Sequence, residues 1–421
     1  MRRIALAVWV LAALGFGQHW EHELVDAGGV DPGVRMAWGP DSLLYLCYTG
    51  DSGRTRLARK DSCWHFEDVP QSVTSTGCLP SFAFGPDGEV AVTYLNGQEA
   101  WLSVRRGTAW ASCSVPYRPR NDWPVLPVTF DSLGRALVPV TFDPFGGGWA
   151  LALGLACLQE DSTWSINDTI DIGPHGPRYY VVGFGRKSDL SPWGAYVVYV
   201  YDIAYLYMGI YWFEWRGAWE LGRWFGAERA FVGPGCGSID RRDSVHAAYY
   251  CSDTTQFGVW FDRARLVELD PECVALAFDS CSRPFIALTE SESLRFCHRD
   301  GRGWHFLDVN VPGVNWADIT AEGEQPLIAY QTDAGLFLAR GVGIVGVEDG
   351  AEGGRLKAEP EFPSVLRGPE LLLLDCRVLD IQGRDVTDRR ERLAPGVYFI
   401  GEGSRIPGFE GSRVRKVVVQ R

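Results

Sequence analysis

The sequence has little that would let it bind nucleic acid or cross a membrane. Lys and Arg number 40 against 53 Asp and Glu, which gives a net charge of -13 at pH 7. Binding to phosphate backbones or to anionic lipid depends on Lys and Arg, so this balance argues against both partners. Beyond residues 4–14, no apolar run approaches the length of a transmembrane helix. We therefore expect a soluble protein with no nucleic acid partner and no membrane span.

The eleven cysteines lack the spacing of a zinc site. No Cys-x-x-Cys pair occurs, and no histidine accompanies the cysteines at the usual zinc-ligand spacing. We therefore expect no metal and no cofactor. Local disulfides between Cys63 and Cys78 or between Cys236 and Cys251 are options for an exported chain, but the cysteine count is odd. For most of the cysteines we expect small buried thiols.

Motifs for catalysis are scarce. Gly50-Asp51-Ser52-Gly53 resembles the nucleophile loop of a serine protease, but Arg54 stands where a glycine is expected. The glycine-rich segment 233–237 precedes no predicted helix, so it is not expected to bind phosphate. Segment 19–23 has the composition of a zinc-protease helix but the wrong spacing. The sequence favours a protein without catalysis over an enzyme.

What the sequence does contain is a repeat of about 45 residues. Each copy has an apolar strand, a polar tight turn and a second strand, followed by further strands, most of them ending in a Trp-led segment; the clearest copies are Ser81–Tyr94 and Ala275–Leu288. This period is typical of a β-propeller blade, a four-stranded sheet that needs neighbours to cover both faces. The first strands begin near Arg35, Pro80, Pro127, Tyr180, Cys236, Cys273 and Trp316. We predict an all-β fold, a seven-bladed β-propeller.

The outer strands predict how the ring closes. Trp-led outer segments begin at Trp64, Trp110, Trp164, Trp219 and Trp304, with Arg265–Leu269 as the fifth-blade candidate. The seventh copy, Trp316–Arg340, has no such segment, whereas Trp20–Asp26 resembles one at the other end of the chain. We predict that the N-terminal strand completes the last blade, which would leave no unpaired edge. The alternative is an unrelated lead-in strand.

The turns between first and second strands carry aspartates that invite a catalytic interpretation. Gly39-Pro40-Asp41-Ser42 and Gly85-Pro86-Asp87-Gly88 are examples, with Asp131 and Asp279 in similar positions. Pro and Asp in these positions are typical of tight turns. We therefore expect these carboxylates to be structural.

The N-terminus has the pattern of a secretory signal. Met1-Arg2-Arg3 precedes the apolar run 4–14, and Gly15-Phe16-Gly17 supplies small residues before Gln18. We predict cleavage after residue 17 and a propeller over residues 18–341. A Gly- and Glu-rich linker over residues 342–358 and a small β-sandwich over residues 359–421 would follow.

The tail resembles the C-terminal sorting domain of type IX (Por) secretion substrates. The resemblance rests on the hairpin Val378–Val386, the segment Leu393–Phe399 and the basic-then-apolar strand Arg415–Val419, while the usual Pro-Asn-Pro opening is missing. It implies passage across an outer membrane, contact with the secretion machinery, and a secreted or cell-surface location. The alternative is an appended adhesive sandwich without a targeting role.

The connections between blades are the predicted binding face. Two of them are rich in aromatic, amide and cationic groups, which recognition sites use on rigid scaffolds. The candidate ligand contacts are Tyr117, Arg118, Arg120, Asn121, Asp122, Trp123, His175, Arg178, Tyr179 and Trp316. The alternative is that the aromatic residues only fill the rim. The aromatic run Tyr196–Trp215 is expected to pack within its blade, with a stacking platform for sugar rings as the other option.

These features favour a non-catalytic extracellular or surface protein that binds a glycan or another protein. Two rivals stay open: a secreted glycoside hydrolase of the sialidase-like propeller type, and a structural surface component. No blade carries the Ser-x-Asp-x-Gly-x-Thr-Trp turn of sialidase-like propellers. An enzyme should gather carboxylates and a base in a deep pocket, whereas a binder should gather aromatic residues and Arg around a shallow mouth.

Overall fold

The structure is a computed structural model. It describes residues 19–28, 33–72, 79–96, 99–116, 127–142, 151–173, 178–201, 206–228, 231–252, 257–262, 264–301 and 303–344, together with four short strands after residue 364. The chain divides into two compact units, Met1–Glu348 and Asp349–Arg421. The predicted boundaries of the linker and of the signal segment stay predictions.

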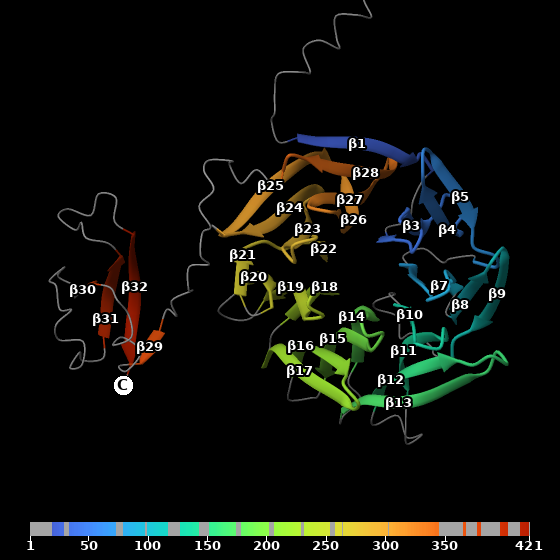
Figure 1. The fold of residues 1–421 in the computed structure, drawn as a ribbon, viewed down its shortest axis with the longest axis horizontal. Helices are drawn as coiled ribbons and strands as arrows, with labels where there is room; N and C mark the ends of the chain where they lie inside the picture. Colours follow the sequence, from blue (N-terminus) through green and yellow to red (C-terminus); the bar gives the residue numbers. More distant parts are fainter. Residues whose placement is uncertain are drawn as a thin grey trace, which may run out of the picture. The chain divides into compact units, whose positions relative to one another are not determined.

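In the described part of the first unit, twenty-eight strands form seven four-stranded sheets. The sheets are arranged around a common axis, with inner strands such as β14, β18, β22 and β26 facing the centre (Figure 1). Every neighbouring pair of strands within these sheets is antiparallel, as in a blade built from consecutive hairpins. The prediction of a seven-bladed β-propeller is confirmed.

The blades follow the chain in order, each from inner to outer strand. The first three are β2 (Val34–Trp38), β3 (Leu44–Thr49), β4 (Thr55–Lys60), β5 (Trp64–Asp68); β6 (Ser81–Phe84), β7 (Val90–Asn96), β8 (Glu99–Arg106), β9 (Ala109–Ser114); and β10 (Thr129–Phe130), β11 (Ala136–Phe142), β12 (Leu151–Leu158), β13 (Trp164–Gly173). The next three are β14 (Arg178–Arg186), β15 (Pro192–Tyr201), β16 (Leu206–Trp215), β17 (Trp219–Glu228); β18 (Phe231–Ile239), β19 (Val245–Ser252), β20 (Phe257–Phe261), β21 (Ala264–Val267); and β22 (Cys273–Phe278), β23 (Pro284–Glu290), β24 (Ser293–Asp300), β25 (Gly303–Pro312). The predicted Trp-led outer strands are β5, β9, β13, β17 and β25, and the weaker candidate in blade five is β21.

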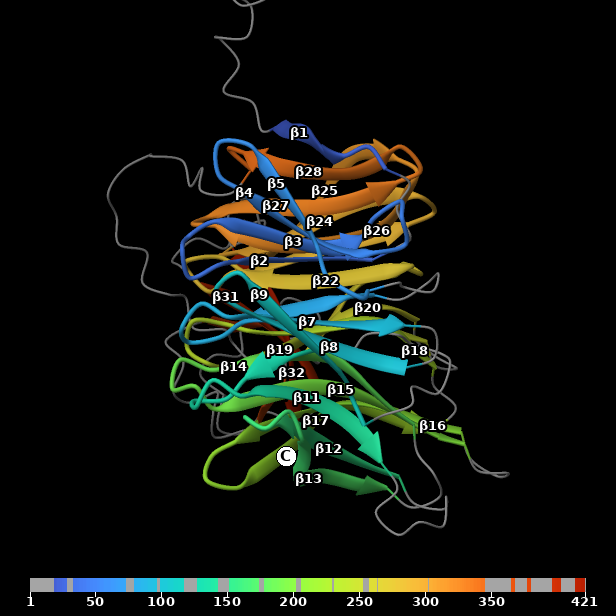
Figure 2. The same ribbon diagram turned by 90° about the vertical axis from the view of Figure 1, so that its right-hand side faces the viewer.

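The seventh blade takes its outer strand from the other end of the chain. Its inner strands are β26 (Val314–Glu322), β27 (Gln325–Thr332) and β28 (Gly335–Val342), and β1 (His19–Asp26) pairs antiparallel with β28. The register runs from His19 opposite Val342 to Asp26 opposite Leu336. Both views show β1 alongside β28 (Figures 1 and 2). The prediction that the N-terminal strand completes the last blade is therefore confirmed.

Side chains of β1 also hold the first blade. Glu23 accepts a hydrogen bond from Trp64 Nε1 at 2.9 Å and pairs with Lys60. Asp26 accepts one from the Tyr48 hydroxyl at 2.6 Å and pairs with Arg56 at 2.9 Å. The backbone of β1 thus pairs with the seventh sheet, while the carboxylates of Glu23 and Asp26 bind side chains of the first blade.

The apolar core is divided among the joints between blades. Seven clusters of buried side chains occur in the described residues, and each joins two adjacent blades. The cluster between blades seven and one contains Val25 from β1, Tyr48 from blade one and Leu338 from blade seven. Burying one large apolar side chain contributes about 1.5–3 kcal/mol. Since both faces of every sheet are covered in this way, no blade depends on its own residues alone.

Turn aspartates are structural, as predicted. Asp131 Oδ1 accepts backbone N–H groups of Leu133 and Arg135 at 2.9 and 2.8 Å, and Asp279 Oδ1 does the same within its own turn. Asp41 accepts from the backbone of its turn and from the Tyr45 hydroxyl. These contacts close the turns between first and second strands.

All nine cysteines in the described residues are free thiols, and six of them are buried. Cys236 lies opposite Ala248 rather than Cys251 in its hairpin, so this disulfide option is wrong. Cys63 is free and exposed, and its suggested partner Cys78 lies outside the described residues. The expectation of small buried thiols is confirmed for most of the described cysteines.

The described residues of the second unit form one mixed four-stranded sheet. Its order is β29 (Val365–Arg367), β32 (Arg413–Gln420), β31 (Gly396–Glu402) and β30 (Arg377–Leu379), with β29 parallel to β32. The strands of the three tail motifs pair here, while the predicted sandwich stays a prediction. Across the described chain, the structure contains no helix with the length and apolar character needed to span a membrane.

Candidate functional site

The predicted binding face lies mostly outside the described residues. Tyr117, Arg118, Arg120, Asn121, Asp122, Trp123 and His175 are in the connections that the structure does not describe. Arg178 begins β14, but its side chain is not described. The ligand-binding role of these residues stays a prediction.

The two remaining candidates are packed in the propeller. Tyr179 is 6% exposed in the cluster between blades three and four, with its ring 5.9 Å from that of Tyr196. Trp316 is half-buried against the cluster between blades seven and one. The structure does not bring these two residues together.

A cavity of about 290 Å³ occupies the centre of the ring. It is lined by inner-strand residues of six blades and by Pro127, which precedes the inner strand of blade three. Gly183 and Gly237 allow the inner strands of blades four and five to approach closely, because a Cβ on Gly183 would lie 2.5 Å from the Gly237 carbonyl oxygen. The lining mixes apolar side chains such as Phe82 and Ile319 with the polar and charged groups of Ser81, Arg35 and Asp318.

One ion pair lies in this channel. Arg35 Nη1 of blade one is 3.8 Å from Asp318 Oδ1 of blade seven, and Asp318 Oδ2 accepts the Met36 N–H at 2.7 Å. Burial raises the pKa of Asp318, an effect that the Arg35 charge only partly offsets. Burial also raises the pKa of Cys236 and Cys273, the thiols nearest this pair, so both stay protonated. The pair joins the first and last blades and is a structural contact.

A larger pocket of about 600 Å³ opens on the face opposite to the predicted one, between blades four and five. Consecutive antiparallel strands bring the first and third turns of a blade to the same edge of its sheet. The pocket is therefore built from the turns after β14, β16 and β18. It is lined by Lys187, Asp189, Ser191, Trp212, Glu214, Trp215, Arg216, Arg242, Asp243, Ser244 and Val245.

A buried charge cluster forms the floor of this pocket. Glu214 is 3% exposed and pairs with the buried Lys187, while Arg216 Nη2 lies 2.5 Å from Glu214 Oε1. The Arg216 side chain is 60% exposed, so its remaining N–H groups face solvent. A carboxylate that is buried between two cations is fixed in place by both of them.

Two more carboxylates of the pocket are held by serines. Asp189 accepts from the backbone N–H and hydroxyl of Ser191, and these hydrogen bonds lower its pKa. Asp243 accepts from the Ser188 N–H at 2.9 Å and from the Ser188 hydroxyl, which ties the blade-five turn to the blade-four turn. These hydrogen bonds therefore hold the turns of blades four and five in place at the pocket.

Two tryptophans supply the apolar part of the pocket. Trp212 is half-buried and lies over Gly222, where an added Cβ would lie 2.1 Å from the indole. Trp215 is half-buried and meets Trp219 edge to face at 5.1 Å. Both indoles are held by neighbours in their own blade, so they offer preformed surface.

The aromatic residues of Tyr196–Trp215 fall into two groups, one that packs within the propeller and one that lines the pocket. Tyr196, Tyr211 and Phe213 pack between blades three and four, as expected for blade packing. Trp212 and Trp215 line the pocket instead. The sequence did not indicate this site as a whole, because its charged residues come from three separate places: the turns Lys187–Ser191 and Asp240–Ser244, and the end of β16 with Glu214 and Arg216. A usable signal was present: four of the other five turns carry Gly-Pro-Asp or Asp-Ser, whereas these two carry Lys and Arg.

Comparisons with known proteins bear on the fold only. A scan against models of known families gives no match, and a search of curated proteins gives none either. Among solved structures, the chain is similar to YCF48 bound to a D1 peptide, with 15% identity over 78% of this chain and 96% of that one and a TM-score of 0.44.

Two fungal proteins are similar to a comparable degree. A lectin of Aleuria aurantia in complex with Fucα1-6GlcNAc has 12% identity over 67% of this chain and 97% of that one, at a TM-score of 0.41. AofleA from Arthrobotrys oligospora has 10% identity over 76% and 86%, at a TM-score of 0.39. At these scores the similarities carry no inference about what this chain binds.

Proposed function

We propose that the protein is a non-catalytic binding protein that holds a neutral polyhydroxylated ligand, such as a glycan segment, in the pocket between blades four and five. The observation that carries this proposal is the pairing of Trp212 and Trp215 with Arg216 and Arg242 around one mouth. A sugar ring presents an apolar C–H face and a rim of hydroxyls, and a site with aromatic walls and planar donors suits both.

The charge balance favours a neutral ligand. The lining holds three cations, Lys187, Arg216 and Arg242, and three carboxylates, Asp189, Glu214 and Asp243. Such a pocket offers donors and acceptors in equal measure without a net field for an anion. A sialylated or sulfated ligand would need an excess of cations.

The same contacts argue against a hydrolase. Glycoside hydrolysis needs one carboxyl group that stays protonated and a second that acts as nucleophile or base. Here Glu214 is engaged by Lys187 and Arg216, Asp243 by Ser188, and Asp189 has a pKa lowered by Ser191. None of the three is therefore a free carboxyl group available for this chemistry. The mouth matches the shallow aromatic and Arg arrangement expected of a binder.

The proposal is tested with the full-length chain and two pocket variants. Trp215→Ala and Arg242→Ala should each weaken binding to the best ligand of a glycan array by about tenfold or more, since Trp and Arg anchors of this kind contribute about 1.4 kcal/mol or more. Isothermal titration calorimetry measures the change.

Arg241→Ala is the matched control, because Arg241 neighbours Arg242 in the chain and does not line this pocket. Its affinity should equal that of the unaltered protein. Release of reducing sugar would favour the hydrolase instead. A ligand bound equally well by both pocket variants would refute the site.

We propose in addition that the protein is exported to a secreted or outer-surface location. The charged and apolar start before Gln18 and the three motifs of the tail support this location. The mature protein should begin at Gln18 when its N-terminus is sequenced from the culture medium or cell surface. A protein that retains Met1 would contradict the export route.

A further inference from the structure

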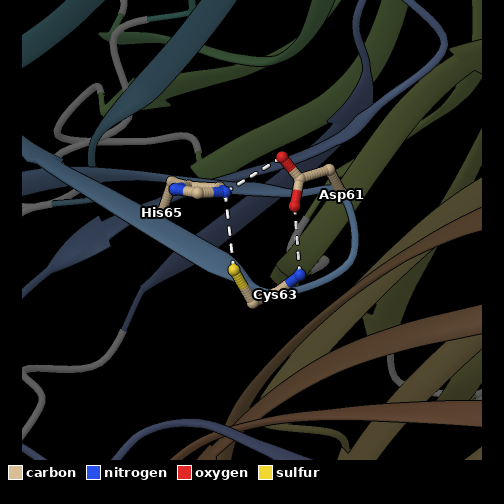
Figure 3. A group of neighbouring side chains, drawn as sticks. All are labelled: Asp61, Cys63 and His65. Carbon is tan, nitrogen blue, oxygen red and sulfur yellow. Dashed lines mark hydrogen bonds and ion pairs between the residues drawn. The ribbon is translucent and has the colours of Figure 1, made fainter.

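We propose that the hairpin between β4 and β5 binds a divalent transition metal ion through Asp61, Cys63 and His65. Their ligand atoms, a carboxylate oxygen, a thiol sulfur and an imidazole nitrogen, all lie within 4.8 Å of one another. Figure 3 shows His65 Nε2 between the Asp61 carboxylate and Cys63 Sγ. The site is on the outer edge of blade one and is separate from the pocket proposed for the ligand.

Backbone geometry explains why these three residues converge. Cys63 and His65 are two residues apart at the start of a strand, so their side chains share one face. Asp61 begins the turn between β4 and β5, where its Oδ1 accepts the Cys63 N–H at 3.0 Å. The intervening Trp64 points the other way, packs on the core and donates to Glu23 at 2.9 Å. The hairpin is thereby anchored under the three ligands.

The two separations from the His65 nitrogen are close to those of tetrahedral zinc coordination. Typical Zn–S and Zn–N or Zn–O lengths imply about 3.6 Å between sulfur and nitrogen and about 3.3 Å between nitrogen and oxygen. Cys63 Sγ lies 3.5 Å from His65 Nε2, and Asp61 Oδ2 lies 2.9 Å from the same nitrogen. A small opening of the Asp61–His65 contact would admit the ion.

The charges and donor atoms of these three side chains favour a divalent transition metal ion. A thiolate, a carboxylate and a neutral imidazole carry a total charge of -2, which a divalent cation neutralises. Sulfur and nitrogen donors favour zinc and its neighbours among the transition metals over calcium or magnesium, which prefer oxygen. The Asp61 and His65 side chains are 38% and 48% exposed, so water can complete the coordination and the ion can exchange.

Blade six supplies an internal comparison. His305 Nε2 pairs with Asp300 Oδ2 at 2.9 Å, the same contact at the same distance as in blade one. Gly303 precedes Trp304 there, whereas Cys63 precedes Trp64 in blade one. The Asp–His pair is thus a repeated feature of the hairpin, and the thiol is what blade one adds. The site has no cysteine pair, which is why its sequence spacing did not predict a metal.

Cobalt titration of the untagged full-length protein under reducing conditions tests the proposal. Co²⁺ bound to a thiolate gives a near-ultraviolet charge-transfer band and visible bands whose intensity reports tetrahedral geometry. One equivalent should bind, and Zn²⁺ should displace it. Cys63→Ser should abolish the charge-transfer band, and His65→Gln should lower the affinity about tenfold or more.

Two variants serve as controls. Cys281→Ser removes another exposed thiol, one that lies near Glu324. His305→Gln removes the histidine of the blade-six pair. Both should bind cobalt as the unaltered protein does. The proposal is overturned if the reduced protein gives no charge-transfer band, if Cys63→Ser retains it, or if Cys281→Ser removes it.

Discussion

Removal of His19–Asp26 should lower the melting temperature of the propeller by about 10 °C or more, because this strand closes the ring. The deletion leaves β28 with an unpaired edge and removes Val25 from the cluster between blades seven and one. It also removes the partners of Trp64 and Tyr48 in blade one. A loss of several kcal/mol of unfolding free energy lowers the melting temperature of a domain of this size by roughly 10 °C. Differential scanning calorimetry measures it.

A chain that begins at residue 19 is the control for this deletion. It keeps all of β1 and should melt as the longer chain does. Adding a synthetic peptide of residues 19–26 to the deleted protein should restore part of the lost stability, since the strand binds only the folded ring. Equal melting temperatures with and without β1 would show that the ring does not depend on it.

The contribution of Asp26 in β1 to the stability of the closed ring should depend on pH. Burial acts to raise the pKa of Asp26, but hydrogen bonds from Tyr48 and the Gly28 N–H, together with Arg56, outweigh it and lower the pKa below 3.8. A lowered carboxyl pKa stabilises the fold above the unfolded value and loses that effect as pH falls through the folded value. The stability difference between the protein and its Asp26→Asn variant should therefore shrink below pH 3.8.

Asp318→Ala should cost about 3 kcal/mol of unfolding free energy or more. The substitution leaves the Arg35 guanidinium, 22% exposed in the channel, without its carboxylate, and it removes the acceptor of the Met36 N–H. Breaking one partner of a buried ion pair is costly, because the other charge stays desolvated. Urea titration followed by Trp fluorescence measures the change.

A double substitution separates this effect from simple loss of packing. Arg35→Met with Asp318→Leu removes both charges and restores apolar volume, but it still leaves the Met36 N–H without its acceptor. Its stability should therefore be clearly higher than that of Asp318→Ala and fall short of the unaltered protein only by the cost of that one unpaired N–H group. If the double variant is as unstable as Asp318→Ala, the loss of stability does not come from the unpaired Arg35 charge.

The ring was predictable because its signals are local and repeated. Alternating apolar strands, Asp-containing turns and the Trp-led outer strands each recur, so an error in one copy is corrected by the others. The closing strand was predictable for the same reason: Trp20–Asp26 resembles the segments at Trp64 and Trp304. The binding pocket is different in kind. Lys187 and Glu214 pair within blade four, and Arg242 joins the same pocket only through the packing of blade five against it, which no spacing along the chain reports.

The metal site proposed in the hairpin between β4 and β5 could not be predicted from the sequence either. Asp61, Cys63 and His65 are close in sequence, but three different donors spaced two residues apart across a turn are a weaker pattern than paired cysteines. Only the bend of the turn, fixed by the Cys63 N–H and Asp61 contact, brings the carboxylate over the other two groups.

The pairing of the first strand with the last blade also determines when the protein can finish folding. His22 of β1 and its hydrogen-bond partner Tyr330 are 308 residues apart. At typical rates of translation, β1 leaves the ribosome on the order of 15 to 60 s before that partner exists. Until then its backbone must stay unpaired or bind something else, and closing so long a loop carries its own entropic cost. A nascent chain stalled before β28 is therefore an open arc whose first strand is free to join a neighbouring chain.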